Sequence, residues 1–377
     1  MNRRRFLAIT RKEFIHVIRD WRSLYLAIAI PAMLILLFGY ALNLDLKNIP
    51  TVVWDQSHTP ESRDLISLFD GSPYFSIENY FDNYRDLEES LNKGSAMIAM
   101  VIPYDFSDKI LSNNTAKIQV IADGSDANTA RLALNYTSTL GLIYNQNVTI
   151  KHASFIGMDD FTIPIELEPR AWYNTDLRSQ NAIIPGIIVI VMVVIAAMLT
   201  SVTVAKEWEM GTMEQLISTP VRVPEIVFGK VVPYFVIGMI DVAIAVYMGQ
   251  WLYDVPLRGS TGLLFATASI FLIGVLSFGL MLSITLKKQV LSNQIAIVGS
   301  YMPSLLLSGF VFAIENMPQP IQWLTYIVPA RYFVTILRGI YLKGIGLEIL
   351  WLDVLLLSIY ALLMILMANK KLKLKLE

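Results

Sequence analysis

Long uncharged stretches alternate with short charged segments along this chain, and this pattern predicts its architecture. Stretches such as Thr261–Leu286 and Gln289–Ile314 contain no charged residue. Each exceeds the roughly 20 residues that a helix needs to cross a bilayer. The pattern predicts six membrane-spanning helices, at about residues 24–42, 182–205, 231–253, 261–286, 289–314 and 349–368.

The loop between the first two predicted spans, residues 43–180, is long enough to form a domain of its own. Apolar runs typical of strands occur at residues 51–54, 75–81, 96–102 and 117–121. Helical patterns occur at residues 60–69, 84–92, 104–112 and 126–150. Strands that alternate with helices predict a small α/β domain.

Composition and charge support a membrane protein and give it an orientation. Apolar residues make up 55% of the chain and charged residues 16%. Lysines and arginines gather before the first span, between spans four and five, and after the last span. Six crossings place these clusters on one side, which the positive-inside rule makes cytoplasmic. We therefore expect both termini in the cytoplasm and residues 43–180 outside. The basic residues of the last cluster are Lys370, Lys371, Lys373 and Lys375.

The first 22 residues are predicted to form an amphipathic helix in the cytoplasmic interface. Phe14, Val17, Ile18 and Trp21 recur at helical spacing, opposite a basic face. Such a helix either anchors the chain at the membrane or contacts a partner. Because the apolar run starts only at Leu24, we expect an uncleaved first membrane helix at residues 23–42 rather than a signal peptide.

Residues 315–348 contain two apolar pieces, about 321–328 and 332–342, that are too short to cross the membrane. Such pieces are typical of a re-entrant hairpin in the outer leaflet. The alternative is a segment that packs beneath the outer domain.

The sequence lacks the motifs of common catalytic sites. It contains no Gly-x-x-x-x-Gly-Lys-Ser/Thr loop for nucleotide phosphates, no His-Glu-x-x-His helix, no Gly-x-Ser-x-Gly elbow and no cysteine. We expect no catalytic residue, metal or cofactor on this chain. Asp241 is the one carboxylate deep in a predicted span. It either faces a polar cavity or accepts a hydrogen bond from a neighbouring helix.

The segment from Lys206 to Pro220 is acid-rich and lies between two apolar spans. Carboxylates at membrane depth are costly, so this segment must lie at one membrane face. By the charge rule this is the cytoplasmic face. Gly211 permits a sharp change of backbone direction, and Pro220 ends the segment.

Several motifs resemble one known family, the permeases of ABC-2 transporters, in the bacterial multidrug-exporter branch with a large extracytoplasmic domain. The specific motif is Glu207-x-Glu209-x-Gly-Thr-Met-Glu214-Gln-Leu between two spans. The supporting motifs are Lys12-Glu13 with Arg19-Asp20, Phe38-Gly39-Tyr40, Ile183-Ile-Pro-Gly186, Ser308-Gly309 with Met317-Pro318, and Pro329-Ala-Arg-Tyr332. The chain has Asn174-Thr175 where relatives often have Asn-Pro, which leaves that local turn undecided.

The resemblance implies an integral membrane fold of six helices, the type V or ABC-2 exporter fold, with an α/β domain inserted between the first two. It implies a coupling helix at about residues 206–220 within the unit 181–377. The residues expected to couple to an ATPase subunit are Glu207, Glu209, Gly211, Thr212, Glu214, Gln215, Leu216, Lys12 and Glu13. The residues expected along a translocation path are Pro185, Asp241, Pro303 and Ser308.

Such a permease has no ATPase site, because ATP and Mg²⁺ bind to a separate nucleotide-binding subunit. The resemblance also implies a second permease half, identical or a paralogue, in the bacterial inner membrane. A periplasmic adaptor, an outer-membrane channel and membrane lipid are further expected partners, and nucleic acid is not. We expect export of amphiphilic compounds such as drugs. The alternatives are a lipid or polysaccharide exporter, an ion-coupled transporter that uses Asp241, and a receptor with an outer sensing domain.

Overall fold

The computed structural model describes residues 2–41, 47–112, 114–125, 127–155, 173 and 178–372. Lys373, Lys375 and the Asn174–Thr175 pair lie outside these residues. The chain forms two compact units. Met1–Asn43 and Arg170–Glu377 make the helical unit, and Leu44–Pro169 make the inserted unit.

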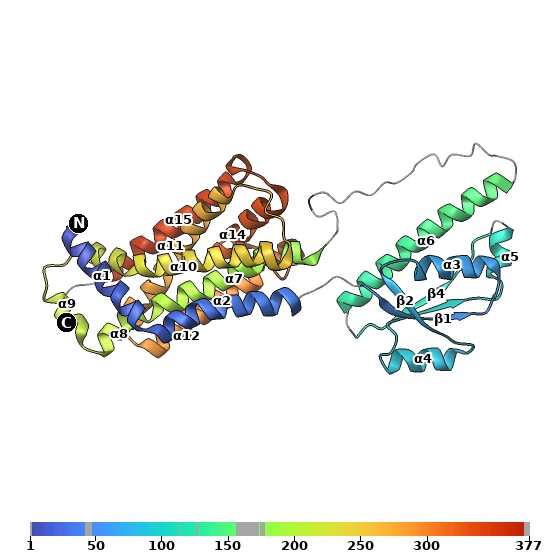
Figure 1. Ribbon diagram of the computed structural model, residues 1–377, viewed down its shortest axis with the longest axis horizontal. Coiled ribbons are helices and arrows are strands. Elements are labelled where there is room, and N and C mark those ends of the chain that lie inside the picture. Colours follow the sequence, from blue (N-terminus) through green and yellow to red (C-terminus); the bar gives the residue numbers. More distant parts are fainter. Residues whose placement is uncertain are drawn as a thin grey trace. The chain divides into compact units, whose positions relative to one another are not determined.

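The helical unit is a bundle of long apolar helices with short helices at its ends (Figure 1). Five helical stretches in the described part of the chain are long and apolar enough to cross a membrane. They are Ser179–Glu209, which comprises α7 (Ser179–Ser201) and α8 (Thr203–Glu209), α10 (Val223–Tyr253), α11 (Thr261–Leu286), α12 (Gln289–Leu307) and α15 (Leu347–Lys371).

The first predicted span corresponds to α2 (Trp21–Ala41), which follows α1 (Arg3–Arg19). The clearly apolar part of α2, Ala27–Tyr40, is shorter than the other spans. A helix of 21 residues is about 30 Å long, close to the thickness of the hydrocarbon core. The crossing by α2, and with it the total of six spans, remains a prediction.

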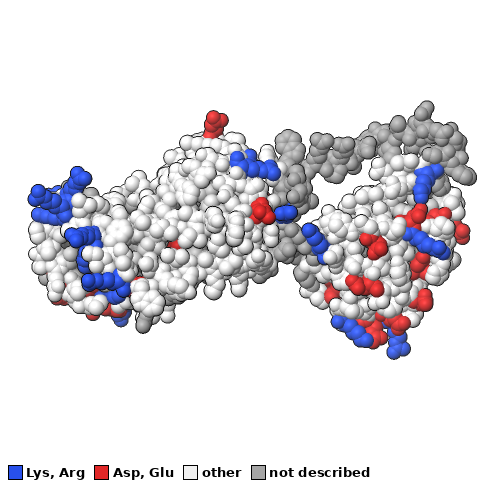
Figure 2. Space-filling model, in the orientation of Figure 1, with Lys and Arg blue, Asp and Glu red and all other residues white. Residues whose placement is uncertain are grey.

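The core of the helical unit forms around α7, whose residues are buried along almost its whole length. The helix packs against α2, α10, α11 and α12. Small residues permit the closest approach, because a Cβ on Gly279 of α11 would lie only 2.8 Å from the carbonyl oxygen of Ala197. Figure 2 shows few charged side chains along the middle of this unit, and lysines and arginines gathered at the end that carries α1. This distribution is typical of a helical bundle in a lipid bilayer.

The inserted unit contains a four-stranded sheet with the strand order β2-β1-β3-β4. The strands are β1 (Ile49–Asp55), β2 (Phe75–Tyr80), β3 (Ile98–Ile102) and β4 (Gln119–Ala122). β1 runs parallel to β2 and β3, and β4 runs antiparallel to β3. The helices are α3 (Pro60–Asp70), α4 (Tyr84–Asn92), α5 (Phe106–Leu111) and α6 (Ala127–Phe155).

These elements follow from the alternation of apolar residues. Val53 of β1 joins a core with α3 and α6, whereas its neighbour Val52 joins a second core with Leu87 of α4. Successive side chains of a strand point to opposite faces, so the sheet is covered on both sides. Each predicted strand and helix of this segment is found, with shifts of a few residues at the ends. The location of this unit outside the cell remains a prediction.

The segment after α12 contains the short helices η1 (Ile314–Asn316), α13 (Gln319–Thr325) and α14 (Pro329–Arg338), followed by a π-helical turn η2 (Gly339–Lys343). Pro329 begins α14 and lies between the two predicted apolar pieces. Phe333, Ile336 and Leu337 are fully buried, and α14 packs against α7, α11 and α15. The hairpin is therefore part of the helical unit, and its re-entry into a membrane remains a prediction.

Candidate functional site: a buried ion cluster beside a cavity

The predicted coupling segment consists of two short helices with a sharp turn between them. α8 continues the direction of α7 as far as Glu209, and α9 (Thr212–Ile217) follows. Gly211 lies between them with φ 71°, in the left-handed region that favours glycine. Two short helices thus replace the single coupling helix expected over about 206–220, and the change of backbone direction predicted at Gly211 is found.

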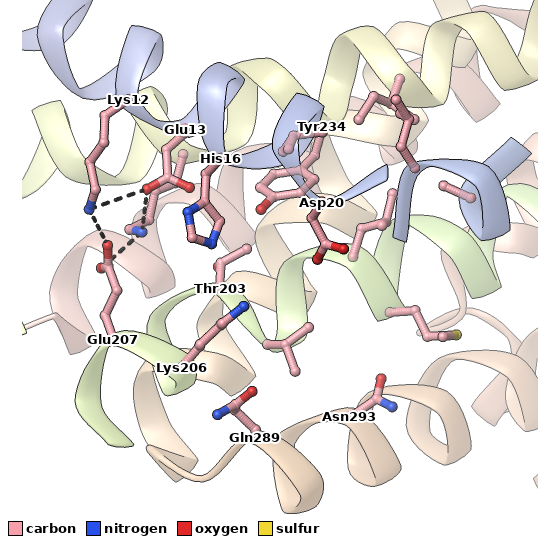
Figure 3. Close-up of a pocket in the computed structure, with 18 of the residues that line it drawn as sticks. Lys12, Glu13, His16, Asp20, Thr203, Lys206, Glu207, Tyr234, Gln289 and Asn293 are labelled. Atoms are coloured by element: carbon pink, nitrogen blue, oxygen red, sulfur yellow. Dashed lines mark hydrogen bonds and ion pairs between the residues drawn. The ribbon is translucent and has the colours of Figure 1, made fainter. Parts of the chain in front are cut away.

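Four charged side chains from three helices meet beneath this turn, and we call them the ion cluster: Lys12 and Glu13 of α1, Glu207 of α8 and Lys230 of α10. Lys230 Nζ lies 2.9 Å from a carboxylate oxygen of Glu13 and 2.9 Å from one of Glu207. Lys12 Nζ lies 2.6 Å from Glu207 and 3.8 Å from Glu13. Figure 3 shows the two carboxylates converging on the two ammonium groups.

The ion cluster is almost fully buried, except for the side chain of Lys12. The residue Lys230 is 1% exposed, Glu13 4% and Glu207 9%. Two positive and two negative charges balance, as buried charges must. Partial burial alone would lower the pKa of Lys12, but its hydrogen bond to Glu207 and the attraction of Glu207 and Glu13 outweigh burial and raise this pKa.

Further contacts hold α1 along the first turns of α10. The backbone N–H of Asn2 donates to Glu225 Oε1 at 2.5 Å, and Glu225 is fully buried. Gly229 leaves room for Ile9, since a Cβ there would lie 2.8 Å from Ile9 Cγ2. The helix α1 is therefore fixed to α10 by packing as well as by charge.

The structure shows which face of α1 contacts the rest of the protein, while its place in the membrane interface stays a prediction. The helix buries Ile9, Thr10 and Glu13 against the protein, whereas Ile18 and Trp21 are about two-thirds exposed. The predicted apolar stripe is thus partly exposed, as an interfacial helix requires, although Val17 packs against the core of the helical unit. The face that contacts α10 contains a carboxylate, because Lys230 supplies its counter-charge.

The structure also corrects the expected roles within the coupling segment. Glu207 was expected to offer its charge to a partner, but its carboxylate contacts Lys12 and Lys230 of the same chain. Met213, on α9, is fully buried and therefore offers no surface to a partner. Exposed residues of the segment include Glu209, Met210, Thr212, Glu214 and Gln215, of which Met210, Thr212 and Gln215 also line the cavity described below.

The remaining members of the segment hold the turn in place. The carboxylate of Glu209 accepts hydrogen bonds from the backbone N–H and the side chain of Gln289 at the start of α12. The Thr212 hydroxyl donates to the carbonyl oxygen of Glu207 at 3.3 Å. Leu216 is half-buried and packs against the core of the helical unit.

A cavity of about 700 Å³ adjoins the ion cluster (Figure 3). It is lined by α1, α2, α7, α8, α9, α10 and α12. Its polar wall includes the ion cluster, His16, Lys206, Gln289 and Asn293. Its apolar wall includes Leu24, Ala27, Ile30, Val194, Ile195, Met198, Leu199 and Ile237.

The four residues predicted along a translocation path do not line this cavity in the described part of the chain. Pro185 lies inside α7, Pro303 inside α12, and Ser308 at the end of α12. Asp241 is 3% exposed, and neither carboxylate oxygen has a hydrogen-bond partner among the described residues. The alternative that Asp241 bonds to a neighbouring helix is therefore not what the structure shows.

Sequence reasoning missed Lys230 and the cavity. The third span was predicted to begin at about residue 231, which leaves Lys230 in the preceding loop. In the structure, α10 begins seven residues before Lys230, at Val223. Pro224 in the first turn of α10 was the available signal, because proline is favoured where helices begin.

Taken together, the fold and the site define a membrane protein of several crossings with an ion-paired cluster at one end of its helical bundle. A family model described as "ABC-2 family transporter protein" matches residues 21–369. The chain belongs to this family, as its motifs indicated.

Relatives of known name agree with this assignment. The chain is 37% identical over 342 residues to "Probable multidrug ABC transporter permease YbhS" of Escherichia coli (strain K12), covering 90% of this chain and 89% of the relative. It is 30% identical over 352 residues to "Probable multidrug ABC transporter permease YbhR" of the same organism, covering 92% of each. It also matches "ABC transporter G family member 20" of Dictyostelium discoideum, at 25% identity, over 91% of this chain and 47% of the relative. The chain is thus a permease of an ABC transporter, a role that implies an ATPase partner and a second permease.

Proposed function

We propose that this chain is the membrane subunit of an ATP-driven exporter that moves amphiphilic, drug-like compounds out across the bacterial inner membrane. A separate subunit binds ATP and Mg²⁺ and hydrolyses the nucleotide. The multidrug names of the two Escherichia coli relatives support the substrate class. The apolar bundle and the cavity with one polar wall agree with amphiphilic cargo.

The proposed orientation places α1, α8 and α9 in the cytoplasm together with both termini. The basic residues of α1 and the Lys287–Lys288 pair between α11 and α12 support this orientation through the positive-inside rule. The inserted unit then lies in the periplasm. There it is available to an adaptor and, through it, to an outer-membrane channel.

The observation that carries the coupling role is the double contact of Glu207 with α1 and α10. The exposed residues Glu209, Met210, Thr212, Glu214 and Gln215 form the surface that meets the ATPase subunit. A displacement of this surface reaches α7 directly, because α8 continues that helix. It also reaches α1 through Lys12 and α10 through Lys230. The ion cluster therefore makes three elements respond together.

The proposal separates docking from transmission, and two variants test the two steps. Glu214→Lys reverses an exposed charge on α9, and we expect it to reduce by roughly threefold or more the ATPase subunit that copurifies with the tagged chain. Glu207→Gln keeps the docking surface, so we expect normal copurification with ATP hydrolysis no longer coupled to transport into inside-out vesicles. Glu348→Lys is the matched control, because it reverses an exposed glutamate at the start of α15.

The orientation has its own test. The chain has no cysteine, so Glu209→Cys introduces a single labelling site. We expect a membrane-impermeant maleimide to label it in inside-out vesicles and not in intact spheroplasts. Labelling from the periplasmic side would refute the coupling role.

Asp241 supports one competing function, an ion-coupled transporter, because it is buried without a hydrogen-bond partner in the described part of the chain. If this function is correct, Asp241→Asn abolishes transport while ATPase binding and hydrolysis persist. The exporter proposal expects transport by Asp241→Asn to remain ATP-dependent.

A further inference from the structure

The cavity beside the ion cluster has a polar wall and an apolar wall, and three of the segments that line it change from apolar to charged residues in the same direction. On α7 and α8 the lining changes from Val194 and Met198 to Lys206 and Glu207. On α10 it changes from Ile237 to Lys230, and from α2 to α1 it changes from Ile30 to Lys12. Three independent segments thus place charge at the same end.

Most charged side chains at or near the polar wall already have partners. The two lysines and two glutamates of the ion cluster compensate each other. Glu209, near the same wall, is engaged by Gln289, and Asp20 has an interaction of its own.

Lys206 is different. Its ammonium group has no ion pair or hydrogen bond to any residue that the structure describes. Figure 3 shows its nitrogen among His16, Thr203 and Gln289, with no interaction to them. An unpaired ammonium in a partly enclosed wall provides a favourable contact for an anion.

We propose that the cavity binds one anionic amphiphile of drug size, with its acidic head at Lys206 and its apolar part against Ile195, Met198 and Ala27. The volume of about 700 Å³ lies within the range of sites for single drug-sized ligands. The amides of Gln289 and Asn293 lie on the same wall as further polar contacts. This inference rests on the proposed export function and narrows its substrate class to compounds with a carboxylate, phosphate or sulfonate head.

The test uses tritiated laurate as the probe and the purified full-length chain in nanodiscs of phosphatidylcholine, with protein-free discs as the blank. We expect saturable binding that dodecyl phosphate displaces and that dodecylamine, with the same chain and a positive head, does not displace. Lys206→Gln is expected to weaken binding about tenfold, the effect of losing one charged hydrogen bond. Lys206→Arg keeps the charge and should stay within about threefold of the unchanged chain.

Two further variants separate a specific site from nearby charge and from general folding. Lys288→Gln removes an exposed lysine close to the same helix ends but outside the cavity wall, and it should bind laurate normally. Met198→Trp fills the apolar end of the cavity and should abolish binding, whereas Met302→Trp, on the exposed side of α12, should not.

Equal effects of Lys206→Gln and Lys288→Gln, or equal displacement by dodecylamine, would overturn the proposal. Adding phosphatidylglycerol to the discs tests whether the natural ligand is a membrane lipid. If it abolishes laurate binding at low fractions, the site holds an anionic membrane lipid and the drug-sized assignment is wrong. No ATPase subunit is present in this assay. Failed laurate binding with intact coupling therefore refutes only this inference, and lost coupling with intact laurate binding refutes only the exporter proposal.

Discussion

Lys230→Met is the substitution that most directly tests the ion cluster. The side chain is fully buried and lies 2.9 Å from both Glu13 and Glu207. Methionine preserves most of its length but removes the charge, so two buried carboxylates are left with Lys12 alone. Removing one partner of a buried ion pair typically costs about 3–5 kcal/mol. Because Lys12 still lies 2.6 Å from Glu207, we expect the lower end of this range, about 3 kcal/mol.

A loss of about 3 kcal/mol corresponds to a fall of about 6–12 °C in the unfolding midpoint of a unit of this size. The assay is the monodisperse fraction of the full-length chain that remains after heating, measured by size-exclusion chromatography. Lys288→Met is the matched control, because it removes an exposed lysine. It should shift the midpoint by no more than about 1 °C.

The double variant Glu13→Gln with Lys230→Met distinguishes lost charge balance from lost packing. It removes one charge of each sign and leaves Lys12 paired with Glu207. Replacing both members of a buried pair is far less costly than removing one member. We therefore expect the double variant to regain most of the unfolding temperature that Lys230→Met loses. A single variant as stable as the unchanged chain, or a double variant less stable than the single one, would refute the charge argument.

Two other predictions concern the turn and the inserted unit. Gly211→Val places a β-branched residue at φ 71°, which costs about 1–2 kcal/mol locally, and it should release the ATPase subunit in copurification. Gly211→Asn should retain this subunit, and equal retention by both variants would contradict the role of the turn. In the inserted unit, the hydrogen bond that Ser107 donates to Glu61 at 2.6 Å lowers the pKa of this glutamate below 4.5. The stabilising contribution of this hydrogen bond is therefore present above pH 4.5 and is lost as the pH falls through the lowered pKa of Glu61. Protection factors of α3 and α5, corrected for the intrinsic pH dependence of amide exchange, should fall in that acidic range, and Ser107→Ala should remove this pH dependence.

The architecture followed from local patterns wherever the physical cause was itself local. Uncharged stretches predicted helices because a backbone in lipid must satisfy its own hydrogen bonds. Alternating residues predicted β1 to β4 because side chains of a strand alternate between faces, and Val52 and Val53 confirm this directly. Gly211 and Pro329 were local signals that the structure bears out, since the backbone turns at the first and α14 begins at the second, whereas the start of α10 at Val223 was missed.

The candidate site was predicted only in part. The motif resemblance named Lys12, Glu13 and Glu207, and the structure brings these three residues together. Glu214 and Gln215 lie exposed on α9, and of these two only Gln215 lines the cavity beside the cluster. From sequence alone, every carboxylate of an acidic segment at a membrane face is expected to face outward. No local pattern distinguishes a carboxylate that is paired within the protein from one that is solvated.

Lys230 shows why the rest could not be predicted from local sequence. A lysine within a membrane helix is costly, so sequence reasoning ended the loop at this residue and began the span after it. The helix α10 nevertheless includes Lys230, because Glu13 supplies the counter-charge. Glu13 lies 217 positions away in the sequence, so no local pattern could reveal this pair. The two residues are each unfavourable alone: a lysine inside an apolar helix, and a glutamate on the buried face of an amphipathic one. Together they are neutral and define where α1 rests on α10. The position of α1 is thus set by the ion pair between Glu13 and Lys230, which belong to distant segments of the sequence. Only the folded chain shows that these two residues neutralise each other.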